Sequence, residues 1–319
     1  MINKNDFKYR KPVFVSSIKS QHIRLKNGNL VVEDKDSKII TQLSCYNIMI
    51  IFVIGDITVT TALIRASKKY GFTVAFMNGM YRTEAMIGNS RNGQVVIRKM
   101  QYEYKGNELA NWIVKNKIQN QITVLTRLGN LHSIKDVIEM LSAYLNELNN
   151  NVLEKDSLRG IEGNAAKLYF KTLFIDEKWY GRKPKQRKDF INATMDIGYT
   201  ILFNFLETIV RYYGFDLYIG FYHTEFWTRK SLICDLIEPF RPIIDEKISV
   251  CIRQKKVVPN DFYIENECLY LKKKKWPEYQ NIFADAIMER RFEIFEFIKN
   301  FYKEFANQKN VNQYPYFKV

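Results

Sequence analysis

The feature that most constrains the fold of this chain is a change in the spacing of its apolar residues near Arg98. Before Arg98 the apolar residues form short alternating runs, which is typical of β-strands. After Arg98 they recur with helical spacing, and few turn residues interrupt them. Strands followed by helices indicate the α+β class. We therefore predict a small N-terminal β-rich domain followed by a larger all-α domain.

The N-terminal part contains signals for short strands and one tight turn. Residues 11–34 read KPVFVSSIKSQHIRLKNGNLVVED, in which Asn27-Gly28 is the expected turn of a β-hairpin. A strand is predicted in IMIIFVIG, a helix in TVTTALIRASKKYG and a second strand in FTVAFMNG, which together indicate a βαβ-like unit. We assign this domain to residues 1–81.

The rest of the chain is divided between a linker and a helical domain. The stretch RTEAMIGNSRNGQ is polar and rich in Gly and Asn, so residues 82–97 are the candidate linker. Residues 98–319 are assigned to the helical domain. Its predicted helices lie in the segments 107–128, 134–148, 163–174, 191–214 and 281–305.

The net charge of +15 is partly concentrated in two runs, RKPKQRK at 182–188 and LKKKKW at 271–276. This excess predicts a polyanionic partner, with nucleic acid before an anionic membrane surface. The alternative for either run is a solvated loop. The longest apolar run, 45–54, is about half of the ~20 residues that a membrane span needs. Without a secretory signal in the first residues, we expect a cytoplasmic protein.

Several classes of site are excluded by the absence of their motifs. The four cysteines are far apart and form no CxxC pair, so a disulfide framework and a structural zinc site are both unsupported, and buried free thiols are expected. No Walker loop, GxGxxG, HExxH or GxSxG is present, which excludes nucleotide hydrolysis and serine hydrolase chemistry.

Glu162 is the first candidate site residue, because it lies among small residues in LRGIEGNAAKLYF. Glycine inside a helix costs about 1 kcal/mol relative to alanine, so Gly163 suggests that a neighbouring helix or a DNA backbone passes close by. The alternative is that Gly160 ends one helix and Glu162 is an ordinary acidic residue in the first turn of the next.

A second candidate segment contains His223 and two acidic residues. A helix is expected to begin near Ser231 as its N-cap, and Asp235 and Glu238, three residues apart, share one face of it. The alternative is an amphipathic helix whose acidic residues face water. Taken together with Glu162, these residues form a mixed oxygen and nitrogen donor set that suits Mg²⁺ or Mn²⁺. In a basic protein such a set suggests phosphodiester chemistry.

Three separated segments resemble the family of CRISPR-associated integrases usually called Cas-one. They are RGIEGNAAKLYF with Glu162, NATMDIGYTILF at 192–203, and the stretch from His223 to SLICDLIEPFRP at 231–242, with weaker support from TTALIRASKKYGFTVAF. The resemblance covers nearly the whole chain. It implies that Glu162, His223 and Glu238 bind the divalent metal, with Asp235 as an auxiliary residue.

The resemblance also implies an activity and partners. Members form homodimers through the β-rich domain, and two dimers flank a dimer of the small protein Cas-two while holding a short DNA duplex, the prespacer. The implied function is a metal-dependent DNA integrase that joins prespacer 3′-OH ends to the CRISPR repeat array by transesterification. The implied cofactor is Mg²⁺ or Mn²⁺.

Two other functions stay open at this point. The same site could serve a structure-selective endonuclease that cleaves branched DNA with water as nucleophile, or the chain could be a noncatalytic basic scaffold that binds nucleic acid. Tyr199 is a candidate neighbour of the site, with a core position as its alternative. The candidate DNA-binding residues are Arg159, Arg182, Lys183, Lys185, Arg187, Lys188 and Arg241.

Overall fold

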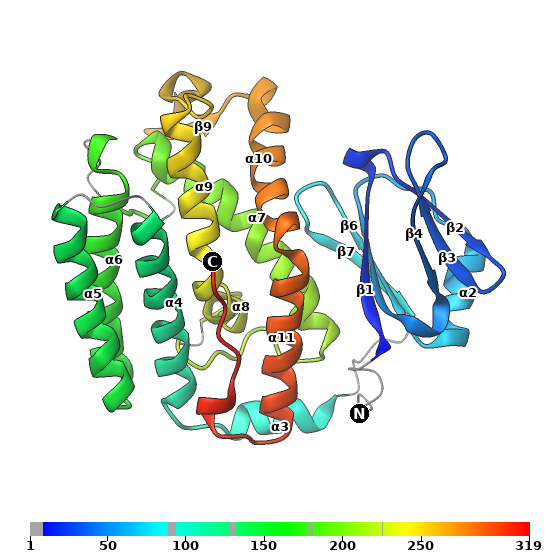
Figure 1. The fold of residues 1–319 in the computed structure, drawn as a ribbon, viewed down its shortest axis with the longest axis horizontal. Helices are drawn as coiled ribbons and strands as arrows, with labels where there is room; N and C mark the ends of the chain where they lie inside the picture. The colour runs from blue at the N-terminus through cyan, green and yellow to red at the C-terminus, as the bar shows by residue number, and fades with distance from the viewer. Residues whose placement is uncertain are drawn as a thin grey trace. The chain divides into compact units, whose positions relative to one another are not determined.

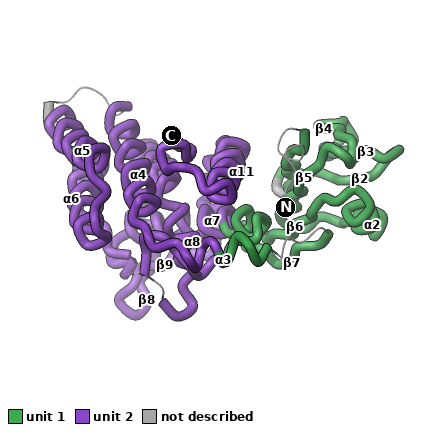
Figure 2. The backbone as a smooth tube through the Cα atoms, turned by 90° about the horizontal axis from the view of Figure 1, so that it is seen from below, with its two compact units in different colours: residues 1–99, 207–215 green, residues 100–206, 216–319 purple. Residues whose placement is uncertain are grey.

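The computed structural model describes residues 9–88, 94–127, 132–177, 179, 181–184, 186–224 and 226–319 (Figure 1). The chain forms two compact units, which Figure 2 shows in different colours. The first unit comprises residues 1–99 and 207–215, and the second comprises 100–206 and 216–319. A β-rich N-terminal region therefore precedes a largely helical region, as the change in apolar spacing predicts.

The first unit contains two sheets. The four-stranded sheet has the order β1 (Lys11–Ser16), β5 (Ile48–Ile54), β6 (Thr73–Met77) and β7 (Thr83–Gly88). The three-stranded antiparallel sheet is built from β2 (His22–Lys26), β3 (Asn29–Glu33) and β4 (Ile39–Ser44). Apolar side chains from both sheets and from α2 (Thr61–Tyr70) form the core of this unit.

The predicted local structures of this unit are present. Asn27 and Gly28 have φ angles of 50° and 72°, as a two-residue hairpin turn between β2 and β3 requires. Strands β5 and β6 pair in parallel, with α2 between them in the sequence, so the βαβ unit is confirmed. Strand β5 is buried along its whole length, which explains its unbroken apolar run.

The candidate linker contains a strand that we did not predict. Residues Thr83–Gly88 form β7, which pairs antiparallel with β6 at the edge of the sheet. Its side chains are only partly buried or exposed, and its sequence, TEAMIG, has no alternation of polar and apolar residues, so the segment looks like a loop in the sequence. Residues 89–93 of the candidate linker lie outside the described residues. The proposed domain boundaries stay predictions.

The second unit is mainly helical, and α4 (Glu108–Arg127) packs against α5, α6, α9 and the 3-10 turn η4. Within the described residues, its sheet is a two-stranded hairpin of β8 (Phe262–Glu265) and β9 (Cys268–Leu271). The other helices along the chain are α3 (Val95–Glu103), which begins in the first unit, α5 (His132–Asn150), α6 (Lys155–Leu173), α7 (Phe190–Tyr212), α8 (Ser231–Leu236), α9 (Arg241–Arg253), α10 (Trp276–Glu289) and α11 (Arg291–Ala306). The 3-10 turns are η1 (Ser17–Lys19), η2 (Cys45–Asn47), η3 (Ile175–Glu177), η4 (Glu238–Phe240), η5 (Pro259–Asp261), η6 (Lys273–Lys275) and η7 (Val311–Gln313).

The predicted helix at 281–305 is two helices, α10 and α11, separated at Arg290. The backbone of Arg290 leaves the helical conformation, with φ −102° and ψ 7°. Its guanidinium donates to the Glu293 carboxylate and to the Lys318 carbonyl, and it lies 4.9 Å from the Phe317 ring centroid. The break at Arg290 therefore allows contacts with the C-terminal segment. The spacing of apolar residues does not predict such a break.

Two further features concern expectations from composition. In the part of the chain that the structure describes, no helix is long and apolar enough to cross a membrane. All four cysteines are free thiols. Cys45 and Cys251 are buried as expected, whereas Cys234 and Cys268 are partly exposed.

Candidate active site

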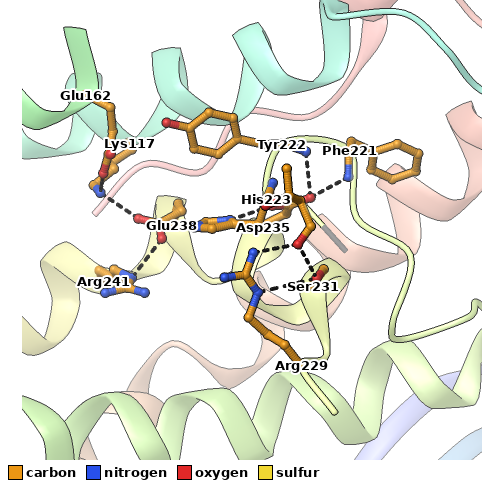
Figure 3. Close-up of polar contacts among 11 residues, drawn as sticks. Lys117, Glu162, Phe221, Tyr222, His223, Arg229, Ser231, Asp235, Glu238 and Arg241 are labelled. Atoms are coloured by element: carbon orange, nitrogen blue, oxygen red, sulfur yellow. Dashed lines mark hydrogen bonds and ion pairs between the residues drawn. The ribbon is translucent and has the colours of Figure 1, made fainter. Parts of the chain in front are cut away.

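Lys117 lies at the centre of the polar cluster in the second unit. It projects from the middle of α4, and its Nζ donates to Glu162 Oε1 and lies 2.6 Å from Glu238 Oε2 (Figure 3). The three side chains are only 8%, 25% and 5% exposed, in the order Lys117, Glu162, Glu238. One buried ammonium thus joins two carboxylates that are 76 positions apart in the sequence.

Glu238 and its backbone are held by contacts from two helices, α4 and α9. The Nε of Arg241, the first residue of α9, lies 3.1 Å from Glu238 Oε1. Asn120 on α4 donates to the Pro239 carbonyl at 2.8 Å, which fixes the backbone beside the carboxylate. Burial opposes ionisation of Glu238, but the charges of Arg241 and Lys117 outweigh it and lower the pKa of this carboxyl to about 2. Glu238 is therefore a carboxylate at neutral pH.

His223 is oriented by Asp235, which is fully buried in α8. Asp235 accepts the backbone N–H groups of Phe221, Tyr222 and His223 at 2.5, 2.9 and 2.8 Å. Its Oδ1 also lies 2.7 Å from His223 Nδ1. The imidazole ring lies between Asp235 and Glu238 in Figure 3. Because Nδ1 is engaged by Asp235, Nε2 is the nitrogen left for a ligand.

The local structure differs from the predicted shared face of Asp235 and Glu238. Helix α8 ends at Leu236, and Glu238 begins η4, so the two carboxylates contact different partners. Both are buried, which excludes the alternative of acidic residues facing water. The N-cap is Lys230 rather than Ser231. The Ser231 hydroxyl instead donates to the Thr224 carbonyl at 3.2 Å, which closes the loop after His223.

Glu162 lies in the middle of a continuous helix. Helix α6 runs through both Gly160 and Gly163, so the alternative in which Gly160 ends a helix is wrong. A Cβ atom built on either glycine would meet no atom within 4 Å. A close neighbouring helix at Gly163, one of our two expectations, is therefore also wrong in the described structure. The bare helix surface beside Glu162 faces open space.

The cluster lines a cavity of about 710 Å³. Tyr199 is one of its lining residues, and the Tyr199 hydroxyl is hydrogen-bonded to Asp245 Oδ1. The guanidinium carbons of Arg182 and Arg241 lie 5.4 and 4.7 Å from the centroid of this ring, at cation–π distance. Burial raises the pKa of Asp245 to about 7, although the Tyr199 hydrogen bond and Arg241 oppose the shift. The lining residues used below are Lys117, Glu162, Gly163, Lys167, Lys171, Arg182, His223, Glu238, Arg241 and Asp245.

The candidate DNA-binding residues fall into two groups. Arg159, Arg182, Arg187 and Arg241 have acidic partners, which are Asp156, Asp196, Asp196 and Glu238. Lys183 and Lys188 are exposed, and Lys188 approaches Glu267 only to 4.0 Å. Lys185 lies outside the described residues.

Two observations bear on whether Glu162, Glu238 and His223 fit a divalent ion. Glu238 is a buried carboxylate whose two oxygens face cations, Arg241 at Oε1 and Lys117 at Oε2. Glu162 Oε1 and Glu238 Oε2 already converge on a cation, the Lys117 ammonium. Among the described side chains, however, no three of His, Cys, Asp or Glu surround one point as metal ligands. The carboxylate and imidazole donors are of the kinds that Mg²⁺ or Mn²⁺ binds. In the structure the Lys117 ammonium lies between the carboxylates of Glu162 and Glu238.

Sequence reasoning missed Lys117 and Asp245 as site residues. Both lie on helices whose polar and apolar residues alternate in an ordinary way. The available signal is the run Asn116, Lys117, Asn120 and Gln121, where polar residues recur at helical spacing inside a helix with many apolar positions. All four are buried, so this run marks a polar interior contact.

The fold and the site together define an α+β protein with a candidate divalent-metal centre in its helical part. A family model described as CRISPR associated protein Cas1 matches residues 15–283. The chain therefore belongs to the Cas1 family, which is the Cas-one family that its motifs predict.

Individual relatives agree with this assignment. A protein of Thermodesulfovibrio yellowstonii named CRISPR-associated endonuclease Cas1 1 is 27% identical over 256 residues, which cover 76% of this chain and 80% of the relative. A solved structure described as a partial Cas6-RT-Cas1–Cas2 complex matches with a TM-score of 0.85 at 20% identity, covering 97% of this chain and 99% of that one. A casposase bound to integration product matches with a TM-score of 0.73 at 19% identity, covering 97% and 100%. The two structural matches concern the fold.

Proposed function

We propose that this protein is a cytoplasmic, metal-dependent DNA integrase of CRISPR adaptation, which joins the 3′-OH ends of a prespacer to the CRISPR repeat array. The observation that carries the proposal is the meeting of Glu162, Glu238 and His223 at one cavity, from three separate elements. Membership of the Cas1 family and the fold shared with a casposase bound to integration product support it.

The chemistry proposed is transesterification without a covalent enzyme intermediate. Mg²⁺ or Mn²⁺, held by Glu162, Glu238 and His223, would polarise the target phosphate and lower the pKa of the attacking 3′-hydroxyl. Asp235 orients His223 through Nδ1, and Arg241 keeps Glu238 ionised. Lys167 and Lys171 line the same cavity and can attract the DNA backbone.

The partners proposed are double-stranded DNA, a second copy of this chain and the small Cas2 protein. The DNA is the prespacer together with the repeat and leader of the array. Support for Cas2 comes from the shared fold with a chain of a structure described as a Cas6-RT-Cas1–Cas2 complex. The excess of positive charge supports DNA as the polyanion.

A strand-transfer assay with Glu162→Gln tests the function. The amide keeps the size of the side chain but is a poor metal ligand, so we expect strand transfer to fall by about three orders of magnitude or more. DNA affinity in chelator should be retained or slightly tightened, because a negative charge facing phosphate is gone. Glu246→Gln is the matched control, since Glu246 pairs with Arg127 and does not line the cavity. Near wild-type transfer by Glu162→Gln, or product formation in EDTA, would contradict the proposal.

A structure-selective endonuclease is the second candidate, favoured by the name of the Thermodesulfovibrio yellowstonii relative. The same site would then use water as nucleophile. On a branched substrate, release of a rejoined strand indicates the integrase, whereas hydrolysed 5′-phosphate ends indicate the endonuclease. Equal DNA binding with and without metal, together with no reaction, would indicate the noncatalytic scaffold instead.

A further inference from the structure

The ion pairs of Glu162 and Glu238 balance in charge, so each carboxylate already has a cation beside it. Glu162 and Glu238 carry two negative charges, and Lys117 and Arg241 carry two positive ones. Arg241 approaches Glu238 at Oε1, whereas Lys117 approaches at Oε2. Lys117 alone of the two cations bridges both carboxylates.

The Lys117 ammonium and a divalent ion would compete for the same atoms. Nζ contacts Glu162 Oε1 and lies 2.6 Å from Glu238 Oε2. One ammonium therefore occupies an oxygen of each carboxylate, and a divalent ion cannot use these two oxygens while the ammonium is there. A divalent ion carries twice the charge of an ammonium, so it can replace Lys117 at these carboxylates.

The backbone of α4 is fixed on both sides of Lys117. Asn116 exchanges two hydrogen bonds with the main chain of Phe317, at 2.8 and 3.0 Å. Asn120 donates to the Pro239 carbonyl and accepts from the Val319 N–H. Because this part of the helix is held at both positions, release of the ammonium has to occur by movement of the flexible Lys117 side chain into the cavity.

We propose that Lys117 is a resident counter-ion, which holds Glu162 and Glu238 together in the metal-free protein and has to be displaced before a divalent ion can bind them. This inference rests on the proposed metal-dependent function. Lys117 is thus a positioning residue that sets the metal affinity of the site.

Mn²⁺ binding to the full chain, measured by isothermal titration calorimetry without DNA, tests the proposal. Lys117→Met keeps the length of the side chain and removes its charge, so the two carboxylates lose their competing cation. We expect the Kd for Mn²⁺ to fall at least tenfold. The melting temperature in EDTA should fall as well, and Mn²⁺ should raise it more than in the wild type. Lys115→Met is the matched control and should leave the Kd unchanged, because Lys115 lies on the same helix as Lys117 but does not line this cavity.

A second variant keeps the test decisive if Lys117→Met does not fold in EDTA. Lys117→Gln can still donate to one carboxylate, and its Kd for Mn²⁺ should also fall several-fold. If the wild type binds Mn²⁺ and the folded variants have an unchanged or higher Kd for Mn²⁺, the proposed role of Lys117 is wrong. The proposed metal site would still stand in that case. If neither the wild type nor the variants bind Mn²⁺ in a way that Glu162→Gln abolishes, the proposed metal site fails, and this inference fails with it.

Discussion

Glu238 and Asp245 are two buried carboxyl groups on the wall of one cavity, and they have opposite pKa shifts. The pKa of Glu238 is lowered to about 2, because Arg241 and Lys117 contact it and outweigh its burial. The pKa of Asp245 is raised to about 7, because its burial outweighs the Tyr199 hydroxyl and more distant cations. Direct contact with a cation therefore keeps Glu238 fully ionised at neutral pH, whereas Asp245 is only partly ionised there.

The raised pKa of Asp245 predicts a pH-dependent stability. Between the ordinary value of 3.8 and about 7, the folded state binds the proton more tightly than the unfolded state. The free energy of unfolding should therefore fall as pH rises through this range, by up to about 1.4 kcal/mol per unit from this group, and level off above pH 7. Asp245→Asn, which cannot ionise, should remove that part of the slope.

Urea denaturation at a series of pH values from 4 to 8 measures this effect. Glu246→Gln is the control, because it neutralises the neighbouring carboxylate, which pairs with Arg127 near the surface. Curves of equal slope for the wild type and Asp245→Asn would mean that Asp245 is ionised in the folded protein at acidic pH.

At the scale of elements, the segment that carries His223 has no regular structure of its own and depends on α8. Three consecutive backbone N–H groups, at 221–223, point to the Asp235 carboxylate. One side chain thus positions both the loop and the imidazole. A carboxylate is needed at position 235 because both side-chain oxygens accept hydrogen bonds from these N–H groups, and an amide has only one oxygen.

Asp235→Asn should therefore act on stability as well as on catalysis. The amide nitrogen would face donors, so at least one buried N–H loses its acceptor, and we expect a loss of about 2–4 kcal/mol in the free energy of unfolding. Asp216→Asn is the control, because Asp216 accepts one backbone N–H, from Tyr218, in a more exposed loop. Equal losses in the two variants would show that Asp235 is an ordinary loop residue.

Elements that depend on local sequence could be predicted, and those that depend on distant contacts could not. The Asn27-Gly28 hairpin and the apolar strand β5 have local causes, in positive φ angles and in burial on both faces. The edge strand β7 and the break at Arg290 follow from partners far away in the sequence.

The candidate site divides in the same way. Glu162, His223 and Glu238 were named from their motifs, and the structure brings them to one cavity. Lys117 was missed because its place among the carboxylates arises only when α4 packs against α6 and η4. The polar run from Asn116 to Gln121 indicates an interior contact, but it does not show which carboxylates Lys117 meets.

At the scale of the whole molecule, the charge of +15 is less available to a partner than the sequence suggests. Within the run 182–188, Arg182 and Arg187 both pair with Asp196, and Arg182 also donates to Asn192. These two arginines are therefore committed to the fold. The exposed Lys183 and Lys188 are the described members of the run that can reach a DNA backbone.

A double substitution of Lys183 and Lys188 by alanine should weaken DNA binding and reduce its salt dependence. If each lysine contacts one phosphate, the slope of log K against log salt should decrease by about 1.8. Fluorescence anisotropy at several salt concentrations measures this slope. The control is the double substitution of Lys309 and Lys318, two exposed lysines of the C-terminal segment, which makes the same change in charge. An unchanged slope for the first pair would mean that 182–188 is a solvated loop.

Gly163 and Gly198 both lie in helices, but only at Gly198 does packing within the protein restrict substitution. A Cβ added at Gly163 has open space around it, whereas a Cβ on Gly198 would lie 2.5 Å from Ile244 Cγ2 and 3.0 Å from the Phe283 ring. Replacement of Gly198 is therefore limited by packing of the protein itself. At Gly163 alanine should even favour the helix, by about 1 kcal/mol. In a library of variants selected for spacer acquisition, intolerance at position 163 would report the shape of the bound DNA rather than the requirements of folding.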